Sequence, residues 1–168
     1  LGYGTEMMRA SVDCSTLVTG SVSIALGQLQ RVNSTRILRW AFIGTERPNR
    51  QEALALFHEW EPHIVGRGSK VGVAFAYSNA DFVLSPRGNI NLDCFRSYEA
   101  SAFGAVPILV GTPQELSTTF DGLGVGGIGK PPWLYADTWE DALKTAQGMS
   151  REQVRQKRNA VLQWWVDS

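Results

Sequence analysis

The chain is poor in the residues that build metal centres and disulfide frameworks. Its 168 residues include only two histidines, His58 and His63, and two cysteines, Cys14 and Cys94. Neither histidine has a second ligand at metal-binding spacing, so we expect no metal site. For the cysteines two interpretations stay open, a pair of ordinary buried thiols, which the lack of a pairing motif favours, or one disulfide. No GxSxG motif is present, which disfavours a Ser-His-Asp hydrolase.

An excess of charge of one sign and long apolar segments are also missing. Sixteen basic and sixteen acidic side chains cancel, and the isoelectric point is near 6.9. Nonspecific binding of nucleic acid or of an anionic membrane is therefore excluded, and any anion site must be local. No apolar run approaches the length of about 18 residues that spans a membrane. Because the chain begins with Leu1, we expect it to be a piece of a longer protein that carries the targeting signals elsewhere.

What the sequence does contain is the alternation of strands and helices of a single α/β domain. A hydrophobic content of 43% and a charged content of 19% exclude a disordered or fibrous chain. Apolar runs predict strands at residues 37–43, 81–85, 106–110 and 133–135. Helical spacing predicts helices at 48–62, 93–103, 138–148 and 150–166. The expected caps are Asp93, Thr138 and Ser150, and Gly104 is expected to end the second helix. Together these elements predict a Rossmann-like parallel sheet with helices on both faces.

The domain boundary is predicted near residue 35. Residues 1–35 are weakly patterned and are expected to connect to a preceding domain, whereas residues 36–168 form the Rossmann-like domain. Asn33 begins an acceptor triplet for N-glycosylation, which is a weak indication of a secretory-pathway protein. Residues 63–79 fit either a short strand or a helix. Residues 122–129 hold five glycines and are expected to be a loop, since no strand and helix flank them as in a dinucleotide fingerprint.

Two loops are predicted to carry an anion site. Residues 44–50 and 85–93 each follow a strand and lead into a helix, which is where open parallel sheets bind ligands. Helix N-termini attract anions, and guanidinium groups bind phosphate oxygens in a forked manner. The candidates in these loops are Gly44, Arg47, Arg50, Ser85, Arg87 and Gly88. The pattern predicts a site for a diphosphate.

The second helix start adds two charged candidates, Arg96 and Glu99. They share one helix face, with Glu99 about 4.5 Å further along the axis. An arginine in the first turn is favourable when an anion lies in front of it, and the carboxylate can then accept the two hydroxyls of a ribose. An exposed i,i+3 ion pair explains the same spacing equally well. The helix face expected to pack on the sheet consists of Phe95, Tyr98 and Ala102.

With these residues in view, the chain resembles the exostosin-type glycosyltransferases. The similarity is concentrated in residues 81–110, where SPRG, then R-x-x-E-A from Arg96, then GxxP leading into the third strand resemble the family signature. Weaker similarity covers Leu1-Gly2-Tyr3 and the segment from Phe42 to Arg50. This resemblance implies that the chain is the C-terminal, donor-binding half of a GT-B fold enzyme.

The resemblance also implies an activity. It is the inverting transfer of a sugar from a nucleotide diphosphate sugar, usually a UDP-sugar, to a glycan acceptor, with no metal or other cofactor needed to hold the donor. By similarity, Arg87 and Arg96 would bind the diphosphate, Glu99 the ribose, and Gly44 with Arg50 the first phosphate loop. The catalytic residues, including any general base, are expected in a missing N-terminal half, so the chain alone is expected to be inactive.

A Golgi location follows from the same resemblance. The protein is expected on the lumenal side of the Golgi membrane as a glycoprotein, with an anchor that lies outside this chain. The residues after the third strand, Gly111-Thr112-Pro113, depart from the acidic and proline-rich turn of the family. The competing hypothesis is a non-enzymatic α/β module that binds a nucleotide or a partner protein. A Rossmann dehydrogenase is disfavoured because no glycine fingerprint follows the first strand.

Overall fold

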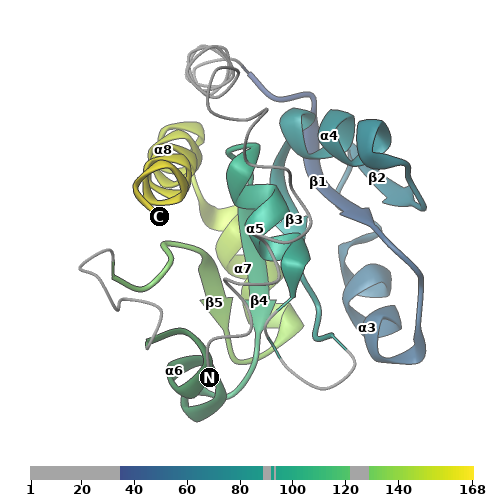
Figure 1. Ribbon diagram of the computed structural model, residues 1–168. Coiled ribbons are helices and arrows are strands. Elements are labelled where there is room, and N and C mark those ends of the chain that lie inside the picture. The colour runs from purple at the N-terminus through teal and green to yellow at the C-terminus, as the bar shows by residue number, and fades with distance from the viewer. Residues whose placement is uncertain (1–34, 89–91, 93, 122–128) are drawn as a thin grey trace. The chain divides into compact units, whose positions relative to one another are not determined.

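A computed structural model describes residues 35–88, 92, 94–121 and 129–168 (Figure 1). Their strands form one five-stranded parallel sheet in the order β2-β1-β3-β4-β5. The strands are β1 (Leu38–Ile43), β2 (His63–Gly66), β3 (Ala80–Leu84), β4 (Val106–Val110) and β5 (Leu134–Ala136). The predicted fold class, a Rossmann-like α/β domain, is confirmed.

Helices alternate with the strands along the described part of the chain. They are α3 (Pro48–Phe57), α4 (Lys70–Asn79), α5 (Phe95–Ala102), α6 (Pro113–Phe120), α7 (Trp139–Gly148) and α8 (Arg151–Asp167). Four of them begin with a side-chain cap that the sequence makes visible, because a serine or threonine accepts a hydrogen bond from the amide three residues later. The predicted caps Thr138 and Ser150 are confirmed.

The side chains of each strand alternate between two layers of helices. On β1, Trp40 and Phe42 belong to a large apolar cluster together with residues of α3 and α7. The intervening Ala41 belongs to a second cluster with Tyr77 of α4 and Ala100 of α5. Helices α4 and α5 therefore cover one face of the sheet and α3 and α7 the other, as Figure 1 shows, while α8 packs beside α5. Parallel strands covered on both faces are apolar throughout, as β4 is.

An ionic network holds the amino-terminal edge of the sheet. Arg158 of α8 is 3% exposed and forms an ion pair with Asp81 at the start of β3, with Nη1 and Oδ1 3.2 Å apart. Arg158 also donates to the carbonyl of Gly104. Arg36 donates to the carbonyls of Tyr77 and Phe103, near the ends of α4 and α5. Gly104 itself has φ 64°, as the predicted helix-terminating glycine requires.

Several boundaries differ from the predictions. Helix α3 ends at Phe57, five residues before Pro62, so Trp60 lies beyond the helix. Residues 63–79 contain both a strand and a helix, β2 and α4, where one element was expected. Helix α6 was not predicted at all. Its signal was Thr112-Pro113-Gln114-Glu115, which is a capping box with proline at the first helical position.

The predicted buried face of α5 is wrong for Phe95, whereas Tyr98 is partly buried against the large apolar cluster. Phe95 is 66% exposed, whereas Arg96, Ser97, Ala100 and Ser101 are buried. The small residues Ser97, Ala100 and Ser101 let α5 lie close to β4, and Trp133 donates from its indole nitrogen to the Ser101 hydroxyl. The bulky residues of the sequence pattern were a poor guide because the packing here favours small side chains.

Some predictions lie outside the described residues. They concern the connecting segment 1–35 apart from its last residue, the glycosylation candidate Asn33, the partner cysteine Cys14, the cap Asp93 and most of the glycine-rich loop. Within the described part, Cys94 is a buried free thiol, as the thiol interpretation expects.

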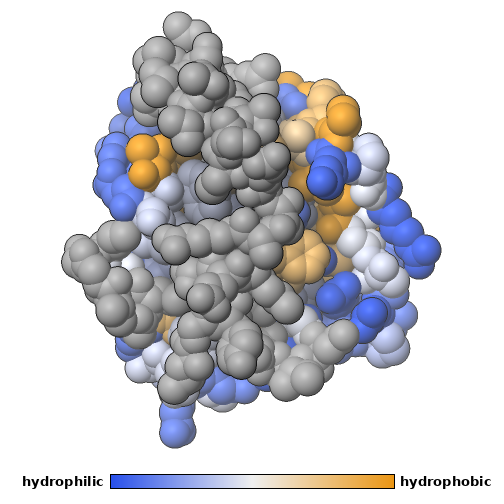
Figure 2. Space-filling model, viewed as in Figure 1, coloured by the Kyte–Doolittle hydropathy of each residue, from blue (hydrophilic) through white to orange (hydrophobic). Residues whose placement is uncertain are grey.

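None of the described helices is long and apolar enough to cross a membrane. Helix α4 exposes Val71 and Phe75, and Figure 2 shows apolar surface in this region, at the upper right.

Candidate functional site

The strand order places a topological switch point between β1 and β3. From β1 the chain passes through α3 to β2 at one edge of the sheet, and from β3 it passes through α5 to β4 in the opposite direction. Helices α3 and α5 consequently lie on opposite faces, and both begin at the carboxyl ends of these adjacent strands. Ligands of open α/β sheets bind at this position. The two predicted anion loops, after β1 and after β3, lie here.

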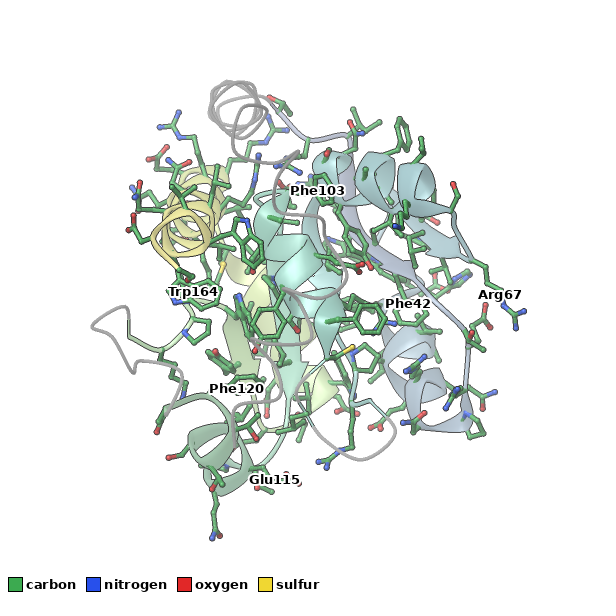
Figure 3. The ribbon with its side chains drawn as sticks, in the orientation of Figure 1. Phe42, Arg67, Phe103, Glu115, Phe120 and Trp164 are labelled. Carbon is green, nitrogen blue, oxygen red and sulfur yellow. The ribbon has the colours of Figure 1, made fainter. Side chains whose placement is uncertain are left out.

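Arg96 is the central residue of this edge. It is only 3% exposed, and its guanidinium lies over the ring of Phe42, with Cζ 4.7 Å from the ring centroid. Its Nε donates to the carbonyl oxygen of Ile43 at 3.2 Å, and Nη1 donates to the sulfur of Cys94 at 3.2 Å. Figure 3 shows Phe42 pointing into the described domain. Arg96 is therefore a buried, oriented cation at the end of β1.

Position 44 has room only for glycine, because the Arg96 guanidinium occupies the space next to Gly44. A Cβ built on Gly44 would lie 2.6 Å from Nη2 of Arg96 and 3.4 Å from the Phe42 ring, and the first of these distances is shorter than real Cβ contacts allow. The amide of Gly44 donates to Gly66 at the end of β2, which fixes the backbone. The absence of a side chain at Gly44 thus makes room for the guanidinium.

A second arginine, Arg50, shares the Phe42 ring. It is 8% exposed, its Cζ lies 6.0 Å from the ring centroid, and Nη1 donates to the carbonyl of Thr45 at 2.7 Å. Burial, and then the positive charge of Arg96, lower the pKa of Arg50 from its ordinary value. Neither arginine forms an ion pair with a carboxylate in the described part of the chain. Two buried cations side by side favour an anion between or in front of them.

The two helices that begin at the switch point lack side-chain caps. The N-cap residues are Arg47 for α3 and Cys94 for α5, and neither side chain caps the helix, unlike those of the other described helices. Ser85, directly after β3, is 2% exposed, and its hydroxyl has no hydrogen-bond partner among the described residues. The Nε of Arg50 is likewise buried without a partner there. Uncapped amides and unsatisfied buried polar atoms at one place are consistent with a ligand that satisfies them.

Glu99 lies one turn after Arg96 and is partly buried. Burial raises the pKa of its carboxyl above the ordinary value, and the charge of Arg96 opposes this shift. The alternative of an exposed Arg96–Glu99 ion pair is wrong for this structure, because Arg96 is buried and bonded to Ile43 and Cys94. The carboxylate of Glu99 makes no hydrogen bond or ion pair within the described residues, so it can accept hydroxyl groups from a ligand.

The Arg87 side chain forms an ion pair with α6. Its Nη2 lies 2.7 Å from Oε1 of Glu115 on α6, and Figure 3 shows Glu115 well away from Phe42. Arg87 and the backbone and hydroxyl of Thr112 lower the pKa of Glu115 to about 2. The loop is also held from α3, since the Asn49 amide donates to the carbonyl of Gly88 at 3.4 Å. The structure thus brings together Gly44, Arg50, Arg96 and the end of β3 at Ser85, with Arg87 at the margin.

Sequence reasoning missed Phe42, Cys94 and Glu115 as neighbours of the candidate residues. Phe42 was interpreted as a strand residue and as the start of a family-like segment, with no contact to the arginines expected. Its partners come from α3 and α5, which follow it at different distances along the chain. The capping box was a visible signal for Glu115. In the described part of the chain, no group of three or more His, Cys, Asp or Glu side chains is placed to hold a metal ion.

The fold and this edge define a Rossmann-like α/β domain with two buried arginines at its switch point. Residues 26–167 match the family described as the RXYLT1 C-terminal domain, and the chain belongs to this family. A zebrafish (Danio rerio) protein named ribitol-5-phosphate xylosyltransferase 1 is 27% identical over 135 residues, which cover 71% of this chain and 29% of that protein. The chain therefore spans less than a third of the length of the curated relative it matches.

This likeness relates the chain to the glycosyltransferases, as its resemblance to a glycosyltransferase family led us to expect. The finer assignment to the exostosin type stays a prediction.

Proposed function

We propose that this protein is the donor-binding domain of a glycosyltransferase and holds a nucleotide diphosphate sugar, in particular a UDP-sugar, at the carboxyl ends of β1 and β3. The observation that carries the proposal is the pair Arg50 and Arg96, which share the Phe42 ring while buried and are not paired to a carboxylate in the described residues. A diphosphate supplies the negative charge that such a pair favours.

The remaining candidates follow from this placement. The uncapped start of α5, together with the Ser85 hydroxyl, would bind phosphate oxygens beside Arg50 and Arg96. The start of α3 would contribute less, because Pro48 has no N–H and the amide of Arg50 already donates to the carbonyl of Arg47. The loop residues Arg87 and Gly88 would border the diphosphate, with Arg87 also tied to Glu115. Glu99, one turn along α5, would accept the ribose hydroxyls. In this proposal the protein itself supplies the positive charge, and no metal is required.

The reaction we propose is sugar transfer with inversion. An acceptor hydroxyl attacks the anomeric carbon, the bond from that carbon to the diphosphate breaks, and the nucleoside diphosphate leaves with an added negative charge. Arg50 and Arg96 would stabilise that charge as it develops. A general base must take the proton of the acceptor hydroxyl, and we propose that it lies outside this chain.

The relative's name makes the substrates more specific. We propose that the transferred sugar is xylose and that the acceptor carries ribitol 5-phosphate, as the name of the zebrafish protein states for that protein. The expected setting is the lumenal side of the Golgi membrane, where the protein would meet nucleotide sugars and glycan acceptors through a longer chain that includes an anchor and an acceptor domain.

Replacement of Glu99 by alanine tests the assignment of the ribose. We expect Glu99→Ala to weaken UDP binding about tenfold, the effect of losing hydrogen bonds to a charged group, and to leave pyrophosphate binding within a factor of two. Isothermal titration of both ligands to the wild-type protein and the variant gives the comparison. Glu152→Ala, on the exposed side of α8, is the matched control and should change neither affinity. Equal losses for UDP and pyrophosphate would refute the ribose assignment.

A further inference from the structure

Tyr77 on α4 carries a buried hydroxyl with no hydrogen-bond partner among the described residues. The side chain is fully buried, and its phenolic oxygen makes no hydrogen bond to any described residue. The carbonyl of Tyr77, by contrast, accepts from Arg36 at 2.6 Å, so the backbone is well anchored. A buried hydroxyl without a partner destabilises the folded protein, and an apolar residue of the same shape would avoid that cost. A tyrosine here therefore calls for an explanation other than packing.

The surroundings of this hydroxyl belong to the candidate site. Tyr77 packs in the apolar cluster that contains Ala41 and Ala100, the latter next to Glu99 on α5. Burial raises the pKa of Tyr77, so the hydroxyl keeps its proton at neutral pH, while the charges of Arg96 and Glu99 both act on it. The Ile43 amide is near enough to influence this pKa, yet no hydrogen bond of ordinary geometry forms. The hydroxyl is a neutral donor with spare capacity, and Tyr77 packs in the same apolar cluster as α5, the helix that carries Arg96 and Glu99.

Of the side chains of Arg96 and Glu99, only that of Glu99 is not held by a hydrogen bond to another described residue. Arg96 is already held by the Ile43 carbonyl, the Cys94 sulfur and the Phe42 ring. Glu99 has no hydrogen-bond partner within the described residues, and its carboxylate must be oriented if it is to accept two hydroxyls of one ribose. A donor behind the carboxylate would fix this orientation, as the groups behind a binding residue commonly do.

We propose, resting on the proposed function, that Tyr77 is a positioning residue whose hydroxyl donates to the Glu99 carboxylate when a nucleoside diphosphate is bound. The hydroxyl does not touch the ligand. Its partner is supplied by the rearrangement of Glu99 on binding, so the unsatisfied donor of the ligand-free protein becomes satisfied in the complex. Tyr77 thereby favours nucleosides with a ribose over a bare diphosphate.

The experiment is Tyr77→Phe, with two readouts that move in different directions. The variant should melt at the same temperature as the wild type or higher, because it loses an unsatisfied buried hydroxyl. It should bind UDP about fivefold to tenfold more weakly, with pyrophosphate affinity unchanged. In the Glu99→Ala background, Tyr77→Phe should cause no further loss of UDP affinity, since the two residues act through one contact. A merely structural role would lower the melting temperature without this selective loss.

Tyr135→Phe is the matched control. The Tyr135 hydroxyl donates to the carbonyl of Pro131 at 3.0 Å and lies on β5, at the far edge of the sheet from β1. This variant should lower the melting temperature and leave both affinities unchanged. The inference is overturned if Tyr77→Phe leaves UDP binding intact, or if it weakens UDP and pyrophosphate equally. If the wild-type protein binds neither ligand, the proposed function fails instead, and Tyr77→Phe then has no affinity to alter.

Discussion

Replacing Gly44 with alanine should weaken the binding of UDP and of pyrophosphate alike, by about 30-fold, which corresponds to the loss of a charge-assisted hydrogen bond. The new Cβ would lie 2.6 Å from Nη2 of Arg96, so the guanidinium must move. It cannot move freely, because Phe42 lies against one face and Ile43 and Cys94 accept its hydrogen bonds. The displacement would therefore remove Arg96 from its oriented position.

Gly66→Ala is the control for this change. Gly66 ends the neighbouring strand and accepts the hydrogen bond of the Gly44 amide, yet a Cβ there would meet nothing within 4 Å. Neither glycine has a positive φ, so the alanine backbone is unstrained at both. Titration calorimetry of the two variants with both ligands separates the effect on Arg96 from a general effect of the added methyl group. If Gly44→Ala binds as tightly as Gly66→Ala, Arg96 has no part in the anion site.

Replacing Arg158 with alanine should give the largest loss of stability, about 3 to 5 kcal/mol at neutral pH. Arg158 and Asp81 form a largely buried ion pair at the amino-terminal edge of the sheet, and the variant would leave the Asp81 carboxylate largely buried with only the charges of Arg36 and Arg39 to compensate it. Burial already raises the pKa of Asp81, and Arg158 is the largest opposing influence. Urea denaturation at pH 7 measures the change in the free energy of unfolding.

The loss should depend on pH in a defined direction. Without Arg158 the folded-state pKa of Asp81 would rise further above its unfolded value, so the folded variant takes up a proton more readily than the unfolded chain. Its stability relative to the wild type is then lowest at neutral pH and recovers as the pH falls through the raised folded-state pKa. Adding Asp81→Asn to Arg158→Ala should recover part of the loss at pH 7. A loss below 1 kcal/mol, or one independent of pH, would show that the pair contributes little.

The fold could be predicted largely because its signals are local. Strand β4 is an uninterrupted apolar run, and α8 begins with a serine and a glutamine in a capping box, so both were located within a residue or two. Helix α6 carries the same kind of signal, Thr112 with Glu115, and could have been predicted from it. The end of α3 at Phe57 had no comparable signal, because the residues up to Pro62 are also acceptable in a helix.

The candidate site could be predicted only by residue type and loop. The strand ends and the arginines indicated an anion site near Gly44, Arg50 and Arg96, and the structure places these residues together. The burial of Arg96 could not be foreseen, because it depends on Phe42, which lies 54 positions earlier in the chain and joins it only through the β1–β3 pairing. The same limit applies to Arg87 and Glu115, whose ion pair joins the loop after β3 to the first turn of α6.

Titration of the protein with UDP, followed through its backbone amide NMR signals, tests the central proposal most directly. We predict saturable shifts concentrated at the end of β1 and at the starts of α3 and α5, at Gly44, Arg50, Arg96 and Glu99, with smaller shifts around Asp81 at the opposite edge of the sheet. Unchanged spectra with UDP and the other common nucleotides at millimolar concentration would contradict the account, because the two buried arginines would then have a purely structural role.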